Sequence, residues 1–299
     1  MDKKRVTFLS DSLTIVGDLY LPSRSSGHPA PAIVFTGPFT GTKEQVTGNY
    51  ARRLAESGFV TLAFDHRNFG ESQGMPRQHE DAQGKINDLR DAVSFLANHP
   101  AVDSNRIGAC GVCLGGAYAL PFAAFEPRIK ALAFVASAFN EAERTRQRFG
   151  AEGYRQQLEN AAATAQRQFQ TGVTEYLPAV APDNGVAVMW GQEPYDYYGT
   201  DRSTSPYWVN QVSVLSIKTL LTLSVSPALP MLALPTLLVH GKTDMVCPPE
   251  DATWVYENIN EPKRILWLPT TNHIDLYDND EFVAPAVSAV TDWFNSHLD

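Results

Sequence analysis

The sequence has few cysteines, few charged residues and no long apolar run. Its three cysteines are too few for a disulfide framework, so we expect a reducing, cytoplasmic setting. Charged residues make up only 19% of the 299-residue chain, which indicates a large core rather than a disordered chain. The most apolar region, residues 212–239, is interrupted by Lys218, Pro227, Pro230 and Pro235, so we expect no membrane span.

The charge that is present is mainly negative. The formal net charge is -9, and both nucleic acid and anionic membrane surfaces would repel a chain of that charge. We therefore expect neither of them as a partner. The charged segment Met1–Val6 leads into a predicted strand, and no apolar signal region follows it.

Strand and helix patterns alternate along most of the chain. Predicted strands cover residues 6–9, 13–21, 32–35, 60–64, 107–112, 129–135, 236–240 and 264–268. Predicted helices cover residues 44–57, 82–98, 114–125, 249–258 and 281–297. Such alternation is typical of an α/β fold with a mostly parallel, twisted sheet and helices on both faces.

The alternation stops after the sixth predicted strand. Residues 140–229 are rich in Arg, Gln, Ala, Tyr and Trp, and they lack short β-branched runs. We interpret them as a helical cap inserted into one core domain, formed by residues 1–139 and 230–299. An insertion at this point is expected to lie over the carboxyl ends of the strands, where such sheets bind ligands.

Aromatic residues of the predicted cap are candidates for substrate binding, in particular Trp190, Tyr195, Tyr198 and Trp208. The alternative is that these rings only pack the cap onto the core. The apolar helix predicted near residues 212–223 would add either lid surface or the contact of a homodimer.

A reactive side chain is predicted where the strand 107–112 turns into a helix. The motif there is Gly111-Val112-Cys113-Leu114-Gly115-Gly116, with Cys113 at the apex. Glycines two residues before and after the apex let the strand and helix backbones approach closely around a strained turn. Cys113 is therefore the predicted nucleophile.

Two further residues complete a catalytic set in the order nucleophile, acid, histidine. Asp244 follows the strand 236–240, and His273 follows the strand 264–268. His273 and the helix beginning at Leu114 would lower the thiol pKa, and Asp244 would orient the imidazole. The backbone N–H groups of Leu114 and Phe39 are the predicted oxyanion hole, because Pro38 has no N–H to offer.

These motifs resemble the α/β-hydrolase superfamily over the whole chain outside the cap. The cysteine, aspartate and histidine resemble the dienelactone hydrolase branch, which also uses a thiol. Three stretches look like bacterial and fungal hydrolases described as dienelactone-hydrolase-like or peptidase-like: residues 41–45, 65–72 and 273–278. This chain differs from dienelactone hydrolases in its long cap and in Thr36-Gly37, where they place a glutamate.

We interpret the chain as a hydrolase of an ester, lactone or thioester of a small-molecule acyl substrate, acting through a Cys113 acyl-enzyme without a cofactor or metal. Two alternatives stay open: acyl transfer or cyclisation in natural-product biosynthesis, and ligand binding without catalysis. Cys110 and Cys113 also form a C-x-x-C pair, which could be redox-active or form half of a zinc site. No second pair exists to complete a zinc site, and Cys247 stands alone in the sequence.

Overall fold

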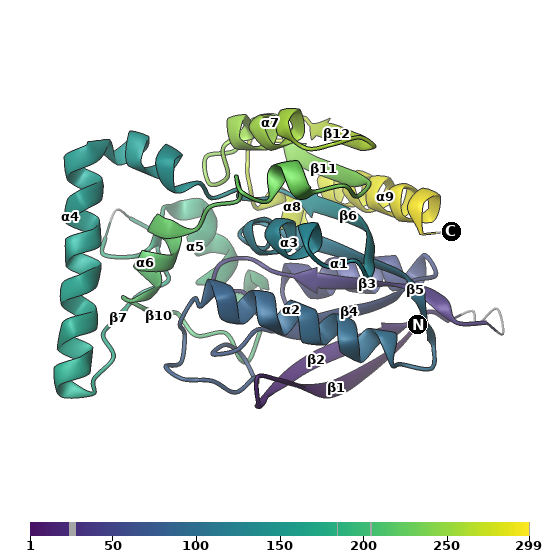
Figure 1. The fold of residues 1–299 in the computed structure, drawn as a ribbon, viewed down its shortest axis with the longest axis horizontal. Coiled ribbons are helices and arrows are strands. Elements are labelled where there is room, and N and C mark those ends of the chain that lie inside the picture. The colour runs from purple at the N-terminus through teal and green to yellow at the C-terminus, as the bar shows by residue number, and fades with distance from the viewer. Residues whose placement is uncertain (24–27, 184, 204, 299) are drawn as a thin grey trace.

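An eight-stranded sheet forms the centre of the protein, in the order β1-β2-β4-β3-β5-β6-β11-β12. The computed structural model describes residues 1–23, 28–183, 185–203 and 205–298 (Figure 1). Strands β1 and β2 are antiparallel to their neighbours, and the other strands pair in parallel. The predicted α/β-hydrolase fold, with its mostly parallel sheet, is confirmed.

The bounds of the sheet strands are β1 Asp2–Ser10, β2 Leu13–Leu21, β3 Ala30–Thr36, β4 Val60–Asp65, β5 Val102–Val112, β6 Ile129–Val135, β11 Thr236–Gly241 and β12 Lys263–Leu268. The bounds of the helices around the sheet are α1 Val46–Glu56, α2 Ala82–Ala97, α3 Gly115–Ala124, α7 Pro249–Asn258, α8 Asp275–Asp278 and α9 Asp280–His297. The short helix α8 was not expected, and β1 and β5 extend further than the apolar runs indicated.

Helices cover both faces of the sheet. Helices α1 and α9 contact each other and pack on one face, while α2 and α3 contact each other and β5 on the other (Figure 1). Because both faces are covered, the central strands are buried along most of their length, as the β3 and β4 burial patterns show. The site therefore has to lie at the strand ends.

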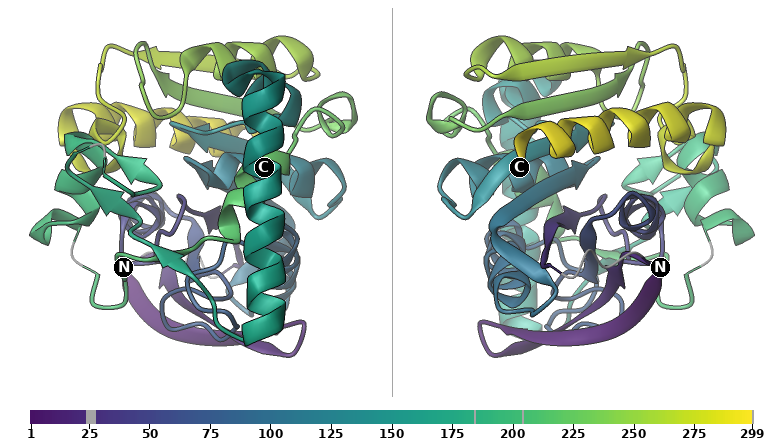
Figure 2. Two further views of the ribbon diagram at one scale, coloured as in Figure 1. Left: turned by 90° about the vertical axis from the view of Figure 1, so that its left-hand side faces the viewer. Right: turned by 90° about the vertical axis from the view of Figure 1, so that its right-hand side faces the viewer.

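Most of the segment between β6 and β11 stands at one end of the molecule, and its last turn, η2 Leu229–Met231, returns to contact α3 and α7 (Figures 1 and 2). It contains the helices α4 Ala142–Thr171, α5 Gln192–Tyr198 and α6 Ser216–Thr222, and the short strands β7 Tyr176–Leu177, β8 Val180–Ala181, β9 Met189–Trp190 and β10 Val212–Ser213. We call residues 140–229 the cap. It is less uniformly helical than the sequence predicted, because short strand pairs and turns connect its helices.

Helix α4 is the longest element of the cap, and its backbone kinks at Gly150, where φ is 71°. None of the helices within the described residues combines the length and the hydropathy that crossing a bilayer requires.

The turn from β5 into α3 depends on close backbone contact. Cys113 adopts φ 52°, the left-handed region that residues with a side chain rarely occupy. Its N–H donates to Val135 O (3.2 Å), and its carbonyl accepts the Ala138 N–H (2.9 Å). A Cβ on Gly115 would lie 2.2 Å from Thr36 O, so only glycine allows β3 to approach this turn.

We expect Gly115→Ala to destabilise the protein by about 3 kcal/mol, because a backbone atom cannot move away from the added methyl group. Urea unfolding measures this loss. The control is Gly153→Ala in α4, where an added Cβ meets only ordinary contacts at 3.7 Å. That change should be neutral or stabilise by up to about 1 kcal/mol, since alanine favours helix. Equal unfolding midpoints for Gly115→Ala and the parent would contradict this account of the turn.

Candidate active site

Asp244 and His273 form a direct pair at the carboxyl ends of β11 and β12. The Oδ2 atom of Asp244 lies 2.6 Å from Nδ1 of His273, and both side chains are buried. The other oxygen of Asp244 accepts the backbone N–H groups of Val246 (2.8 Å) and Cys247 (2.7 Å). The carboxylate is thus fixed on both sides, and it holds the imidazole by Nδ1, which leaves Nε2 for contacts on the other side of the ring.

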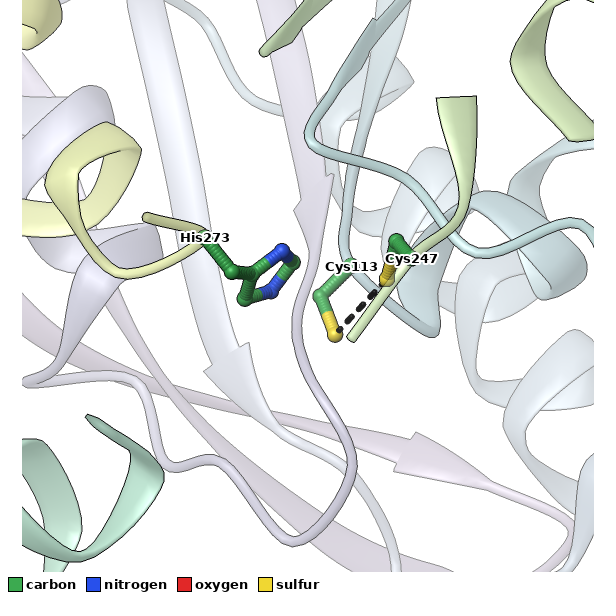
Figure 3. A group of neighbouring side chains, drawn as sticks. All are labelled: Cys113, Cys247 and His273. Atoms are coloured by element: carbon green, nitrogen blue, oxygen red, sulfur yellow. Dashed lines mark hydrogen bonds between the residues drawn. The ribbon is translucent and has the colours of Figure 1, made fainter. Parts of the chain in front are cut away.

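Cys113 lies beside this pair, and a second cysteine lies beside Cys113. The Sγ atoms of Cys113 and Cys247 are 3.9 Å apart, and a ring nitrogen of His273 lies within 4.8 Å of both (Figure 3). Figure 3 shows the imidazole and Cys247 on opposite sides of the Cys113 side chain. The structure therefore brings the three predicted residues together and adds Cys247 to them.

The surroundings of Cys113 favour its thiolate. The sulfur of Cys247 lies within hydrogen-bonding distance of the Cys113 sulfur, and this contact lowers the pKa of Cys113 most. Burial acts to raise the pKa of Cys113, whereas the positive charge of His273 lowers it further. The same hydrogen bond, together with burial, raises the pKa of Cys247. Cys113 is thus the anion of the pair and Cys247 the neutral donor.

His273 is held as an imidazolium. Burial acts to lower its pKa, but the Cys113 charge and the hydrogen bond to Asp244 outweigh burial and raise the pKa to about 10. Nε2 of His273 also lies 3.0 Å from the hydroxyl of Tyr277, one helical turn further along the chain. Burial, followed by the Cys113 charge, raises the pKa of Tyr277, so its hydroxyl stays protonated and able to donate.

The residues of the predicted oxyanion hole line the same cavity as the Cys113 sulfur. Phe39 and Leu114 line a cavity together with Cys113 and Cys247. Neither backbone N–H, of Phe39 or of Leu114, forms a hydrogen bond within the described part of the chain. The oxyanion hole formed by these two N–H groups stays a prediction.

This cavity has a volume of about 680 Å³ and lies between the core and the cap. Its cap side includes Val188, Met189, Trp190, Pro194 and Leu220, and its one ionisable cap residue is Glu193. One carboxylate oxygen of Glu193 accepts the Ile274 N–H at 2.9 Å. The remaining lining is largely apolar, and its volume falls in the range of small-molecule sites.

Only one of the four aromatic residues that we expected to bind substrate lines this cavity. Trp190 does, with 63% of its surface exposed. Tyr198 is buried and stacks on Trp208 with ring centroids 5.5 Å apart, and the Trp208 indole N–H donates to Thr40 Oγ1 at 3.3 Å. Tyr195 packs against the core cluster. For these three residues the structure corresponds to the alternative, in which the rings attach the cap to the core.

Tyr198 nevertheless has one feature of a site residue. Its hydroxyl is buried and has no hydrogen-bond partner among the described residues. Burial, and after it the charges of Tyr197 and Cys113, raise the pKa of Tyr198, so this hydroxyl stays neutral.

Sequence reasoning missed Cys247 and Tyr277. Cys247 has no neighbouring cysteine in the sequence, but the turn closed by Asp244 brings it to the Cys113 sulfur. Its spacing of three residues from Asp244 is a signal that could have indicated this. Tyr277 follows His273 by four residues, a spacing that puts two side chains on one face of a helix. Cys110, in contrast, is buried within β5, so the C-x-x-C pair makes no site.

Comparison with known proteins agrees with this fold. Residues 39–280 match the family model described as serine aminopeptidase, S33, and the chain belongs to this family of hydrolases. It is 31% identical to the uncharacterized protein PA2218 of Pseudomonas aeruginosa, over 100% of this chain and 81% of that one. The crystal structure of PA2218 has a TM-score of 0.88, covering 99% of this chain and 94% of that one.

Two fungal relatives carry functional names. The chain is 30% identical to thiohydrolase aneE of Aspergillus aculeatus, covering 90% of this chain and 85% of the relative. It is 27% identical to polyketide transferase grgF of Penicillium sp, covering 96% and 94%. The GrgF crystal structure has a TM-score of 0.83 and covers 100% of this chain and 99% of that one. A solved dienelactone hydrolase from Anabaena variabilis shares the fold with a TM-score of 0.60 but is only 15% identical, so that part of the resemblance stays a prediction.

We expect iodoacetamide to alkylate Cys113 rapidly at pH values well below about 8.5, where a free thiol is mostly protonated. Cys247→Ala removes the donor that stabilises the thiolate, so its alkylation profile should move to higher pH. Cys110→Ala is the matched control and should leave the profile unchanged. Mass spectrometry of quenched samples gives the rate at each pH. A parent profile centred near 8.5 would contradict the assigned ion pair.

Proposed function

We propose that this protein cleaves esters or thioesters of small apolar acyl groups through a covalent Cys113 acyl-enzyme. The observation that carries the proposal is the buried set of Cys113, His273 and Asp244 at the strand ends, with the aspartate 2.6 Å from the histidine. The family membership and the relative named thiohydrolase support a hydrolase of this kind.

In the proposed acylation, the Cys113 thiolate attacks the carbonyl carbon, and the carbonyl oxygen gains the negative charge. The free N–H groups of Phe39 and Leu114 are the donors available to that oxygen. The His273 imidazolium then gives its proton to the departing alcohol or thiol, and a thioester on Cys113 is left. Asp244 keeps the imidazole in the tautomer that this transfer needs.

In the proposed deacylation, neutral His273 takes a proton from water, and the hydroxide adds to the thioester carbon. Collapse of the intermediate expels the Cys113 thiolate and releases the acid. The starting ion pair is then restored. Because its pKa is raised to about 10, the His273 imidazolium is a weak acid, and leaving groups that need little protonation should react fastest. We therefore expect thioesters and activated esters to react in preference to peptides.

The test is intact-mass spectrometry after exposure to a panel of activated esters and acyl thioesters. The parent and Cys110→Ala should gain the mass of the acyl group, and hydroxylamine should remove it, since it cleaves thioesters. Cys113→Ala should gain nothing, and Asp244→Asn should lose turnover on the order of 10⁴-fold, as expected for a misoriented imidazole. Labelling of Cys113→Ala, or no adduct on any parent sample, would overturn the proposal.

A second candidate function is transfer of the acyl group to an alcohol or amine. The observations that favour it are the largely apolar cavity that the cap closes over Cys113 and the relatives named polyketide transferase. A site that limits water lets a bound acceptor compete for the acyl-enzyme.

Product analysis separates the two outcomes. With a thioester donor and rising concentrations of added alcohols or amines, transfer predicts that acylated acceptor increases while free acid decreases. Hydrolysis predicts that free acid stays constant as acceptor is added. In both cases Cys113→Ala reports the uncatalysed background.

A further inference from the structure

Three metal-binding side chains meet at the cavity, and two of them, Cys113 and Cys247, line it. The Sγ atoms of Cys113 and Cys247 and a ring nitrogen of His273 all lie within 4.8 Å of one another (Figure 3). Each residue is more than nine-tenths buried, with 6%, 1% and 2% of its surface exposed, respectively. The proposed reaction needs Cys113 and His273, but it does not need a second thiol as a ligand.

The spacing of the two sulfurs suits a tetrahedral ion. Zinc binds thiolate sulfur at about 2.3 Å, so two thiolates on one tetrahedral zinc lie roughly 3.8 Å apart. The observed separation of Cys113 Sγ and Cys247 Sγ is 3.9 Å. Two cysteines and one histidine also form a known zinc donor set, whose fourth position stays open for water or a ligand.

The third ligand is already oriented by a carboxylate. Asp244 binds Nδ1 of His273 at 2.6 Å, so Nε2 is the nitrogen left for a metal. This carboxylate–histidine arrangement is the one that commonly supports zinc ligands, since it fixes the tautomer and makes the free nitrogen more basic. The opposing contact is the Tyr277 hydroxyl, 3.0 Å from Nε2, which must give way.

A second cluster of possible metal ligands, Glu44, Asp65 and Glu71, is not available to a metal ion in this way. The ammonium of Lys43 already lies among its carboxylates, at 2.6, 2.9 and 2.8 Å. That cation occupies the position a metal would take, so the carboxylates have their counter-charge. In the thiol and imidazole cluster the positive charge belongs to His273 itself, which becomes a metal ligand once it releases its proton.

We propose that Cys113, Cys247 and His273 form a binding site for a soft divalent cation such as zinc, with the fourth position open to the cavity, and that the bound ion blocks catalysis. The ion forms one bond to each sulfur and one to Nε2. The Cys247 thiol and the His273 imidazolium each release one proton to solvent, so the two thiolates balance the charge of the ion. The proton count rests on the proposed thiolate–imidazolium pair, whereas the binding itself does not.

The test measures metal binding directly, with the thiols kept reduced by a phosphine. Zinc is titrated in competition with a chromogenic chelator, and cobalt(II) serves as a spectroscopic probe. The parent should bind one ion per chain and release two protons near neutral pH. Its cobalt spectrum should show thiolate-to-cobalt charge transfer and tetrahedral bands.

Cys247→Ser is the decisive variant, because a serine hydroxyl can still donate to the Cys113 sulfur but is a poor ligand for zinc. Its zinc affinity should fall by more than the 10–100-fold typical of losing a residue that only orients a ligand. Cys110→Ala is the matched control and should bind as the parent does. Tyr277→Phe removes the competing hydroxyl and should bind zinc as tightly or more tightly.

Equal zinc affinity in the parent and Cys247→Ser, or an octahedral cobalt spectrum without thiolate bands, would overturn the metal site. A parent that forms the Cys113 acyl adduct but shows either result refutes this inference and leaves the proposed function standing. A parent that binds zinc as described but forms no acyl adduct supports the metal site and refutes the proposed function. Inhibition by zinc that a chelator reverses, absent in Cys247→Ser, is the expected consequence for activity.

Discussion

The site depends on one constraint: a buried sulfur can carry a negative charge only if charge and hydrogen-bond donors surround it. His273 supplies the positive charge, and Cys247 supplies the donor. This position of the sulfur strains the backbone, because Cys113 adopts φ 52°. The turn also needs a glycine, Gly115, where it contacts Thr36. The fold is therefore rigid at the point where the chemistry is proposed to occur.

The cap contributes to this arrangement as well as closing the cavity. Glu193 of α5 accepts the N–H of Ile274, the residue that follows His273. Arg202 pairs with Asp278 at the end of α8, with closest atoms 2.6 Å apart. Cap contacts thus hold the histidine loop at both ends of its short helix. Movement of the cap would change the position of His273 together with access to Cys113.

Much of the core could be predicted from the sequence, because each strand is a short apolar run and each candidate catalytic residue follows one. That rule places Cys113, Asp244 and His273 at one sheet edge before any distance is known. The rule did not find Cys247 or Tyr277. The position of Cys247 depends on a loop closed by the Asp244 carboxylate, and that of Tyr277 depends on the unexpected helix α8. Which aromatic residues of the cap line the cavity could not be predicted for another reason. Composition cannot distinguish rings that line a cavity, such as Trp190, from rings that stack beneath the cap, such as Trp208.

The most direct test of the account is the protonation state of His273, followed by nitrogen NMR of ¹⁵N-labelled histidine rings across a pH titration. The account predicts that the parent keeps an imidazolium at neutral pH and loses its proton at about pH 10. It also predicts a lower value in Cys113→Ala, because the thiolate charge that raises the pKa is gone. A parent His273 that titrates near its ordinary value of about 6.5 would contradict the ion pair and the mechanism built on it.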